Sequence, residues 1–169
     1  MKSTNFTSVY FSVIGNVNQF IKIKWSTKEL ILVFFFGITS VHNYAQNQCL
    51  KNGVAVKGYD VVAYFESNKA IEGNSEINTA YKKATYYFST EKNKAMFLKQ
   101  PDKYVPQFGG YCAYGVSENH TSPTDPQAFT IVDDKLYLNY NLKVEEFWSK
   151  EQKARIIKAN ENWKILNNE

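Results

Sequence analysis

Cysteine is scarce in this chain of 169 residues, which contains only Cys49 and Cys112. No Cys-x-x-Cys motif is present, so a thioredoxin-type redox function has no support. A closed zinc site takes about four ligands from Cys, His or carboxylate side chains. The two cysteines and the single histidine that follows residue 45, His120, cannot build a cysteine-rich metal site. Spacing alone does not establish whether Cys49 and Cys112 form a disulfide.

A long hydrophobic run is also absent. A membrane-spanning helix needs about 20 apolar residues, whereas the apolar run at residues 30–38 stops at Ser40. Lysines precede this run and Tyr44-Ala45-Gln46 follows it, which is the order of a secretory signal peptide. We therefore expect residues 1–45 to be a signal peptide with an over-extended start. The protein would then be exported, periplasmic or secreted, without a stable membrane anchor after cleavage.

A strong net charge is missing from the rest of the chain. The sequence has 20 Lys and Arg residues against 16 Asp and Glu residues, and four of those lysines and one glutamate lie in residues 1–45. The remaining net charge of about +1 gives no electrostatic case for nucleic-acid binding. We expect residues 46–52 to be the N-terminal tail of the mature protein and residues 53–169 to be one small domain.

Short elements fill the first half of this domain. Runs of β-branched and aromatic residues predict strands at residues 61–65 and 84–88. The polar residues 72–78 are expected to form a loop. Ser89 and Thr90 can cap a helix over residues 91–100.

A hairpin and a helical tail are predicted in the second half. Residues 128–132 and 135–140 flank Asp133-Asp134, a two-residue turn of the type that joins hairpin strands. Apolar spacing over residues 144–163 is helical, with a break near Ser149-Lys150. The fold class is therefore α+β, a small single domain with short antiparallel strands, a central short helix and a C-terminal helix.

The stretch from Phe108 to Val116 concentrates glycine, aromatic residues and a cysteine, in the order Phe-Gly-Gly-Tyr-Cys-Ala-Tyr-Gly-Val. Glycine allows positive φ and close backbone approach. We expect the Gly109-Gly110 pair to meet Tyr59-Asp60 and to present the Cys112 thiol and neighbouring phenol rings to a cavity. The tyrosines considered for a pocket or for the core are Tyr59, Tyr64, Tyr111, Tyr114 and Tyr140.

Several motifs together resemble the YHS domain, and more closely the exported YHS-domain proteins of bacteria. They are Tyr87-Phe88-Ser89 with the helix and Pro101-Asp102-Lys103-Tyr104 after it, the segment from Val56 to Phe65, the segment from Tyr104 to Gly115, and the segment from Val132 to Tyr140. The resemblance implies a small metal-binding module with cysteine ligands. The chain departs from that pattern, because Phe88-Ser89 lacks the cysteine that such modules often carry there.

The candidate sites leave several functions open. Tyr59, Asp60, Tyr111, Cys112 and Tyr114 are candidate ligand-binding residues of a non-enzymatic domain. Asp60 can equally satisfy nearby backbone N–H groups and fix a turn.

Cys112 and His120 are candidate ligands of a transition metal, copper or zinc, with a buried cysteine and a surface histidine as the structural alternative. A Cys112 nucleophile with His120 as base and Asp125 as its orienting group is the enzyme alternative. A third alternative is a structural or interaction protein without a small ligand.

Overall fold

The computed structural model describes residues 47–167, so the predicted signal peptide lies outside the described residues. The described part is a small α+β domain, as predicted, with one four-stranded sheet, one hairpin and six α-helices that include a C-terminal helix. None of the helices in this part is long and apolar enough to cross a membrane.

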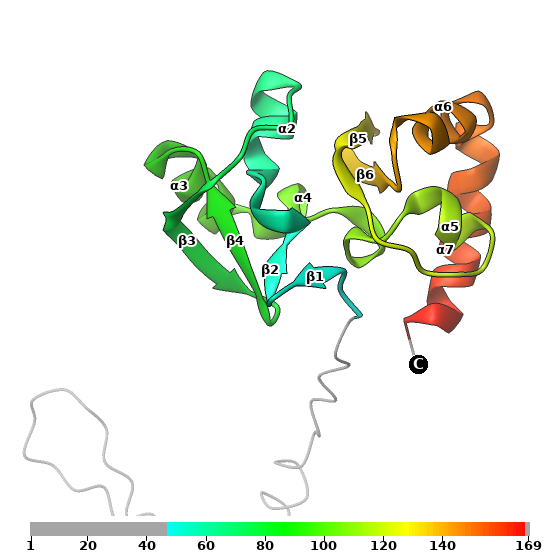
Figure 1. Ribbon diagram of the computed structural model, residues 1–169, viewed down its shortest axis with the longest axis horizontal. Coiled ribbons are helices and arrows are strands. Elements are labelled where there is room, and N and C mark those ends of the chain that lie inside the picture. The colour runs from blue at the N-terminus through cyan, green and yellow to red at the C-terminus, as the bar shows by residue number, and fades with distance from the viewer. Residues whose placement is uncertain (1–46, 168–169) are drawn as a thin grey trace, which may run out of the picture. The chain divides into compact units, whose positions relative to one another are not determined.

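The four-stranded sheet has the strand order β1-β2-β4-β3 (Figure 1). Its strands are β1 (Leu50–Lys51), β2 (Val54–Ala55), β3 (Asn74–Tyr81) and β4 (Ala84–Phe88). β1 pairs antiparallel with β2 and β3 pairs antiparallel with β4, but β2 pairs parallel with β4. The sheet is therefore mixed, and the expected purely antiparallel arrangement is wrong at this pair. β1 also takes up residues 50–51 of the expected N-terminal tail.

The predicted strand at residues 61–65 is a helix, α2 (Val61–Ser67). Asp60 takes the N-cap position, where its side chain accepts from the N–H groups of Val62 and Ala63. The first four residues of α2 are all buried, so the run shows neither strand alternation nor an exposed face. A short apolar run does not distinguish a strand from a buried helix, and the Asp60 cap decides for the helix.

The residues expected as a polar loop, 72–78, mostly belong to strand β3. β3 lies at the edge of the sheet, where its outward side chains meet solvent, so a polar sequence is compatible with strand pairing. The register against β4 shifts between Asn74 and Asn78, which marks a bulge.

The predicted strand at residues 84–88 is confirmed as β4, and the predicted central helix is confirmed as α3 (Glu91–Lys99). Thr90 is the N-cap of α3, and its hydroxyl accepts from the Asn93 N–H. The one-turn helix α4 (Pro101–Tyr104) follows directly and buries Tyr104.

The glycine-rich stretch contains two short helical segments, η2 (Gln107–Gly110) and α5 (Ala113–Ser117). A comparable 3-10 turn, η1 (Val56–Gly58), precedes α2. Phe108 and Gly109 both have positive φ, 54° and 60°. Positive φ is strained for a bulky residue such as Phe108, and such strain is stored where surrounding contacts hold it.

The predicted hairpin is confirmed as β5 (Asp125–Val132) and β6 (Lys135–Asn139), joined at Asp133-Asp134. The helical tail is confirmed as α6 (Leu142–Lys150) and α7 (Gln152–Leu166), with the break at Glu151. In Figure 1 the sheet with α2 and α3 forms one half of the described part, and the hairpin with α5, α6 and α7 forms the other.

Strand β6 separates two hydrophobic cores. Leu136 and Leu138 pack into the first core with α2, α3 and β4. Tyr137, on the opposite face, packs into the second core with Trp148 of α6 and Phe108 of η2. Both faces of β6 are thus buried at its centre, and Lys135 at its start is the one exposed residue of the strand.

Candidate functional site

Asp60 is fully buried, and five donors surround its carboxylate. Besides the two N–H groups of α2, Ser89 donates from its N–H at 2.8 Å and from its hydroxyl at 2.6 Å. The Asn93 Nδ2 donates at 2.7 Å. Asp60 therefore joins the start of α2 to the β4–α3 junction. These donors supply the compensation that a buried charge needs, which is the structural alternative for this residue.

The Tyr59 hydroxyl donates to Glu72 Oε1 at 3.2 Å. Within residues 47–167, no hydrogen bond or ring contact links Tyr59 or Asp60 to residues 108–116. The expected meeting of these two segments is thus not among the interactions of the described part. A ligand-binding role for Tyr59 and Asp60 stays a prediction.

Cys112 is the N-cap of α5 and is 1% exposed. Its sulfur accepts from the Gly115 N–H at 3.4 Å and lies 3.7 Å from Asn139 Oδ1, to which the S–H donates. Asn139 is itself fully buried, and its Oδ1 also accepts from the Tyr114 N–H at 3.2 Å. The thiol is therefore closed off from solvent but lies beside polar groups.

Gly115 lies between Cys112 and His120: its N–H donates to the Cys112 sulfur, and the His120 imidazole packs beside its Cα. A side chain on Gly115 would meet the imidazole of His120, whose Nδ1 is 3.2 Å from the Ser122 hydroxyl oxygen. His120 itself is exposed. Among residues 47–167, no group of three or more His, Cys, Asp or Glu side chains is arranged to hold a metal ion. Copper or zinc binding by Cys112 and His120 stays a prediction, without a third ligand of those types in that part of the chain.

Tyr111 and Tyr114 are both half-buried and contact α7. The Tyr111 ring packs against Trp163, and its hydroxyl donates to the Gln48 carbonyl at 3.3 Å. The Arg155 guanidinium lies over the Tyr114 ring, 4.0 Å from its centre. Both rings therefore help to pack α7 against the glycine-rich stretch.

The segment Asn47–Cys49, which we call the N-terminal strap, crosses this stretch. The Cys49 N–H donates to the Gly109 carbonyl at 2.9 Å. A side chain on Gly109 would collide with the Asn47 carbonyl, so the close approach of the strap requires glycine there. Burial raises the pKa of the Cys49 thiol, which keeps it protonated at neutral pH. Both Cys49 and Cys112 are free thiols in the structure.

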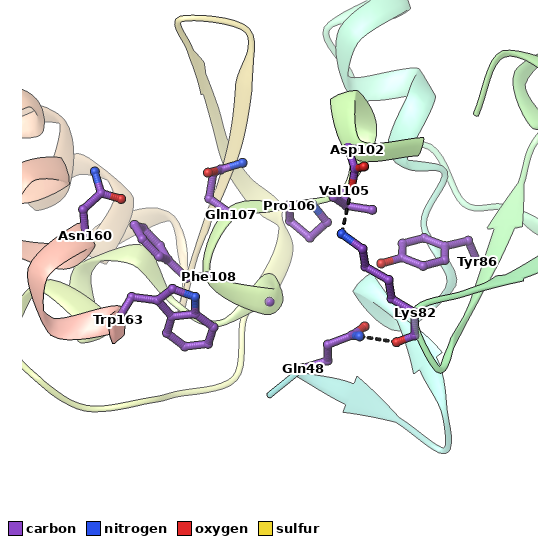
Figure 2. A pocket seen from close by; sticks show the side chains of 11 residues that line it. Gln48, Lys82, Tyr86, Asp102, Val105, Pro106, Gln107, Phe108, Asn160 and Trp163 are labelled. Carbon is purple, nitrogen blue, oxygen red and sulfur yellow. Dashed lines mark hydrogen bonds and ion pairs between the residues drawn. The ribbon is translucent and has the colours of Figure 1, made fainter. Parts of the chain in front are cut away.

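A cavity of about 290 Å³ opens beside Gly109. Figure 2 shows residues of η2 and α7 on one side and residues of the β3–β4 turn, β4 and α4 on the other. Three aromatic residues, three carboxamide residues and one ion pair are among its lining residues: Tyr86, Phe108, Trp163, Gln48, Gln107, Asn160, Lys82 and Asp102. This volume is just below the size range of small-molecule sites, roughly 300–1,000 Å³.

The charges at the cavity compensate each other. Lys82 Nζ lies 2.7 Å from Asp102 Oδ1, and the Tyr81 hydroxyl donates to the same oxygen at 2.8 Å. Hydrogen bonds from Lys82 and Tyr81 lower the pKa of Asp102, and the bond to Asp102 raises the pKa of Lys82. Both groups therefore stay charged at neutral pH, and together they add no net charge.

Most of the cavity was not predictable from local sequence. Phe108 and Gly109 belong to the glycine-rich stretch, but Tyr86 lies on β4 and Trp163 on α7. Gln48 comes from the N-terminal strap. No local motif links these positions, because the fold alone brings them together.

The fold and this site define a small α+β domain with a cavity lined by aromatic, carboxamide and charged side chains. Comparison of the chain with models of protein families, with curated proteins and with solved structures finds no match.

Proposed function

We propose that this protein is an exported, non-enzymatic binding domain of the YHS type that holds a small molecule in the cavity beside Gly109. The observation that carries the proposal is the cavity itself, because a concave site where several polar groups converge is where proteins bind small ligands.

The cavity supports a small molecule better than a metal ion or a thiol reaction. Cys112 is not among its lining residues, and the thiol is already engaged by Gly115 and Asn139. A reactive cysteine is partly exposed and sits in an electropositive environment, whereas Cys112 is 1% exposed. The export proposal rests on the leader sequence, and nucleic acid is not a proposed partner, given the low net charge after residue 45.

Nuclear magnetic resonance of the labelled mature protein tests this proposal. A library of small neutral molecules is added while the Gly109 backbone amide and the Trp163 indole N–H signals are followed. We expect at least one compound to shift both signals in a saturable way. The Tyr140 amide is the internal control, because Tyr140 is 53% exposed and does not line the cavity. Hits that move only signals outside the cavity, or no hits at all, would contradict the proposal.

A further inference from the structure

The Tyr86 hydroxyl is a polar group in the cavity wall that has no hydrogen-bond partner in the part of the chain that the structure describes. The residue is 4% exposed, and its ring packs against Phe97 with centroids 5.0 Å apart. Its hydroxyl end points toward the opposite side of the cavity (Figure 2). Within residues 47–167, no hydrogen bond reaches this hydroxyl. The hydroxyl is not one of the buried polar atoms that lack a partner in the described part, so it reaches the open cavity, where a bound molecule can accept its hydrogen bond.

The remaining polar groups favour partners that both donate and accept. Gln48, Gln107 and Asn160 each carry a carboxamide, which has two N–H donors and an acceptor oxygen. Of these groups, Gln48 already donates from Nε2 to the Lys82 carbonyl, which leaves its side-chain oxygen available. A hydroxyl group is complementary to a carboxamide and to a phenol, because it also donates and accepts. Several such groups around one cavity therefore favour a ligand with several hydroxyls.

The charge of the cavity wall and the geometry of its aromatic rings limit the class of ligand further. Lys82 and Asp102 neutralise each other, so the wall offers no net charge to an ionic ligand. Phe108 and Trp163 meet edge to face, with an interplanar angle of 65° and centroids 5.9 Å apart. They do not form two parallel faces that would enclose a flat aromatic base. They provide instead a ring surface beside Gln107 and Asn160, across the cavity from Lys82, Tyr86 and Asp102 (Figure 2).

From this arrangement we infer that the ligand is a neutral, polyhydroxylated single ring, such as a monosaccharide unit, that places its apolar C–H face on Phe108 and Trp163. Its hydroxyls bond to the Tyr86 phenol and to the carboxamides. Burial raises the pKa of Tyr86, so the phenol keeps its proton and can donate it. This inference rests on the proposed function of the cavity and names its ligand class.

The test is a titration of the mature protein with a panel of neutral monosaccharides and inositol, followed through the Trp163 indole N–H signal. A second panel contains neutral aromatic heterocycles. We expect a member of the first panel to bind and to shift this signal. Tyr86→Phe should weaken that binding by about tenfold, the size of one lost hydrogen bond. Because the Tyr86 hydroxyl has no partner among the described residues, Tyr86→Phe should also unfold at the same urea concentration as the parent.

Tyr140→Phe is the matched control, because it removes a hydroxyl from an exposed tyrosine outside the cavity, and it should bind like the parent. Sugar binding that Tyr86→Phe leaves unchanged would overturn the inference, because the hydroxyl would not be in contact. If only heterocycles shift Trp163, the ligand class is wrong while the proposed function stands. If neither panel shifts the Trp163 signal, both the ligand class and the proposed function are wrong.

A further titration distinguishes the two possible sources of such a ring, a free monosaccharide and the end of a glycan. An oligosaccharide ending in the best monosaccharide is titrated in the same way. Affinity equal to or higher than that of the free sugar identifies a glycan end as the ligand. Affinity at least tenfold lower identifies the free monosaccharide, because the cavity would then exclude the attached chain. Both results support the ligand class.

Discussion

At the scale of single residues, Cys112 serves the backbone of α5. An N-cap side chain satisfies an N–H that the helix cannot pair, and an uncapped start costs about 1 kcal/mol. We therefore expect Cys112→Ala to lower the free energy of unfolding by about 1–2 kcal/mol, since it removes the cap and part of a packed side chain. Cys112→Ser keeps an acceptor at the cap and should lose less. Urea denaturation of the parent, Cys112→Ser and Cys112→Ala measures the order of their unfolding free energies.

The same pair of variants separates the cap from a metal ligand. A metal ion that binds the folded state must raise its stability. We expect added zinc or copper to change the melting temperature equally in the parent and in Cys112→Ser, because the thiol is buried and already bonded. A rise that occurs in the parent and is absent in Cys112→Ser and in His120→Ala would instead establish the predicted metal site.

At the scale of elements, Arg155 of α7 holds α5 in place. Its Nη1 donates to Glu118 Oε1 at 2.9 Å and to the Ser117 hydroxyl at 3.1 Å, and its Nη2 donates to Glu151 Oε2 at 3.0 Å. The Arg155 side chain is 15% exposed, while the Glu118 side chain is 41% exposed. The ion pair alone is therefore partly screened by solvent, and the stacking on Tyr114 adds to it.

This arrangement predicts a loss of stability in acid. Hydrogen bonds from Arg155 and Lys158 lower the pKa of Glu118. A carboxyl whose pKa is lower in the folded state contributes stability above its unfolded pKa, about 4.3, and loses it as the pH falls through the folded value. We expect Glu118→Gln to be less stable than the parent at pH 7, with the difference vanishing near pH 2.

Urea denaturation at several pH values measures this difference. Glu146→Gln is the matched control, because Glu146 forms an exposed pair with Lys150 within α6 and joins no second element. Its effect should be small at every pH. A Glu118→Gln deficit that stays constant down to pH 2 would show that the charge of Glu118 is not the cause.

Elements were predictable where one signal dominated. The Asp133-Asp134 turn between two alternating runs specified the hairpin, and the Thr90 cap specified the start of α3. The prediction of a strand at residues 61–65 was wrong because it followed the strand propensity of the valines. The Asp60 cap and the burial of the first four residues favour the helix instead. Edge strand β3 was missed because its polar residues face solvent and carry no core-directed pattern.

The candidate site shows the same limit. The glycine-rich stretch contributes Phe108 and Gly109 to the cavity wall, but Tyr111, Cys112 and Tyr114, which we expected to face a cavity, are not among the residues that line this one. Tyr86 lies in the predicted strand at residues 84–88 and Trp163 in the predicted helical tail, and their position beside a cavity depends on contacts between distant parts of the chain. Local sequence contains no information on those contacts without the fold.

At the scale of the whole molecule, the N-terminal strap connects the two ends of the described domain and forms one edge of the cavity. The Asn47 Nδ2 donates to the Leu166 carbonyl at 3.0 Å, and its N–H donates to Asn167 Oδ1 at 3.0 Å. Cation and N–H groups are favourable at a helix C-terminus, where carbonyls lack partners. A chain that begins at Gln46, as expected for cleavage after Ala45, keeps every one of these contacts.

We expect a chain that begins at Leu50 to be less stable than one that begins at Gln46, by about 2–4 kcal/mol. It loses the bonds of Asn47 and the one from Cys49 to Gly109, each contributing about 0.5–1.5 kcal/mol. It should also lose ligand affinity, because Gln48 lines the cavity. Gln48→Ala in the longer chain separates the two effects, since it should weaken binding while leaving the strap attached. Equal unfolding free energies for the two chain lengths would show that the strap is not part of the folded unit, and would remove one edge from the proposed binding site.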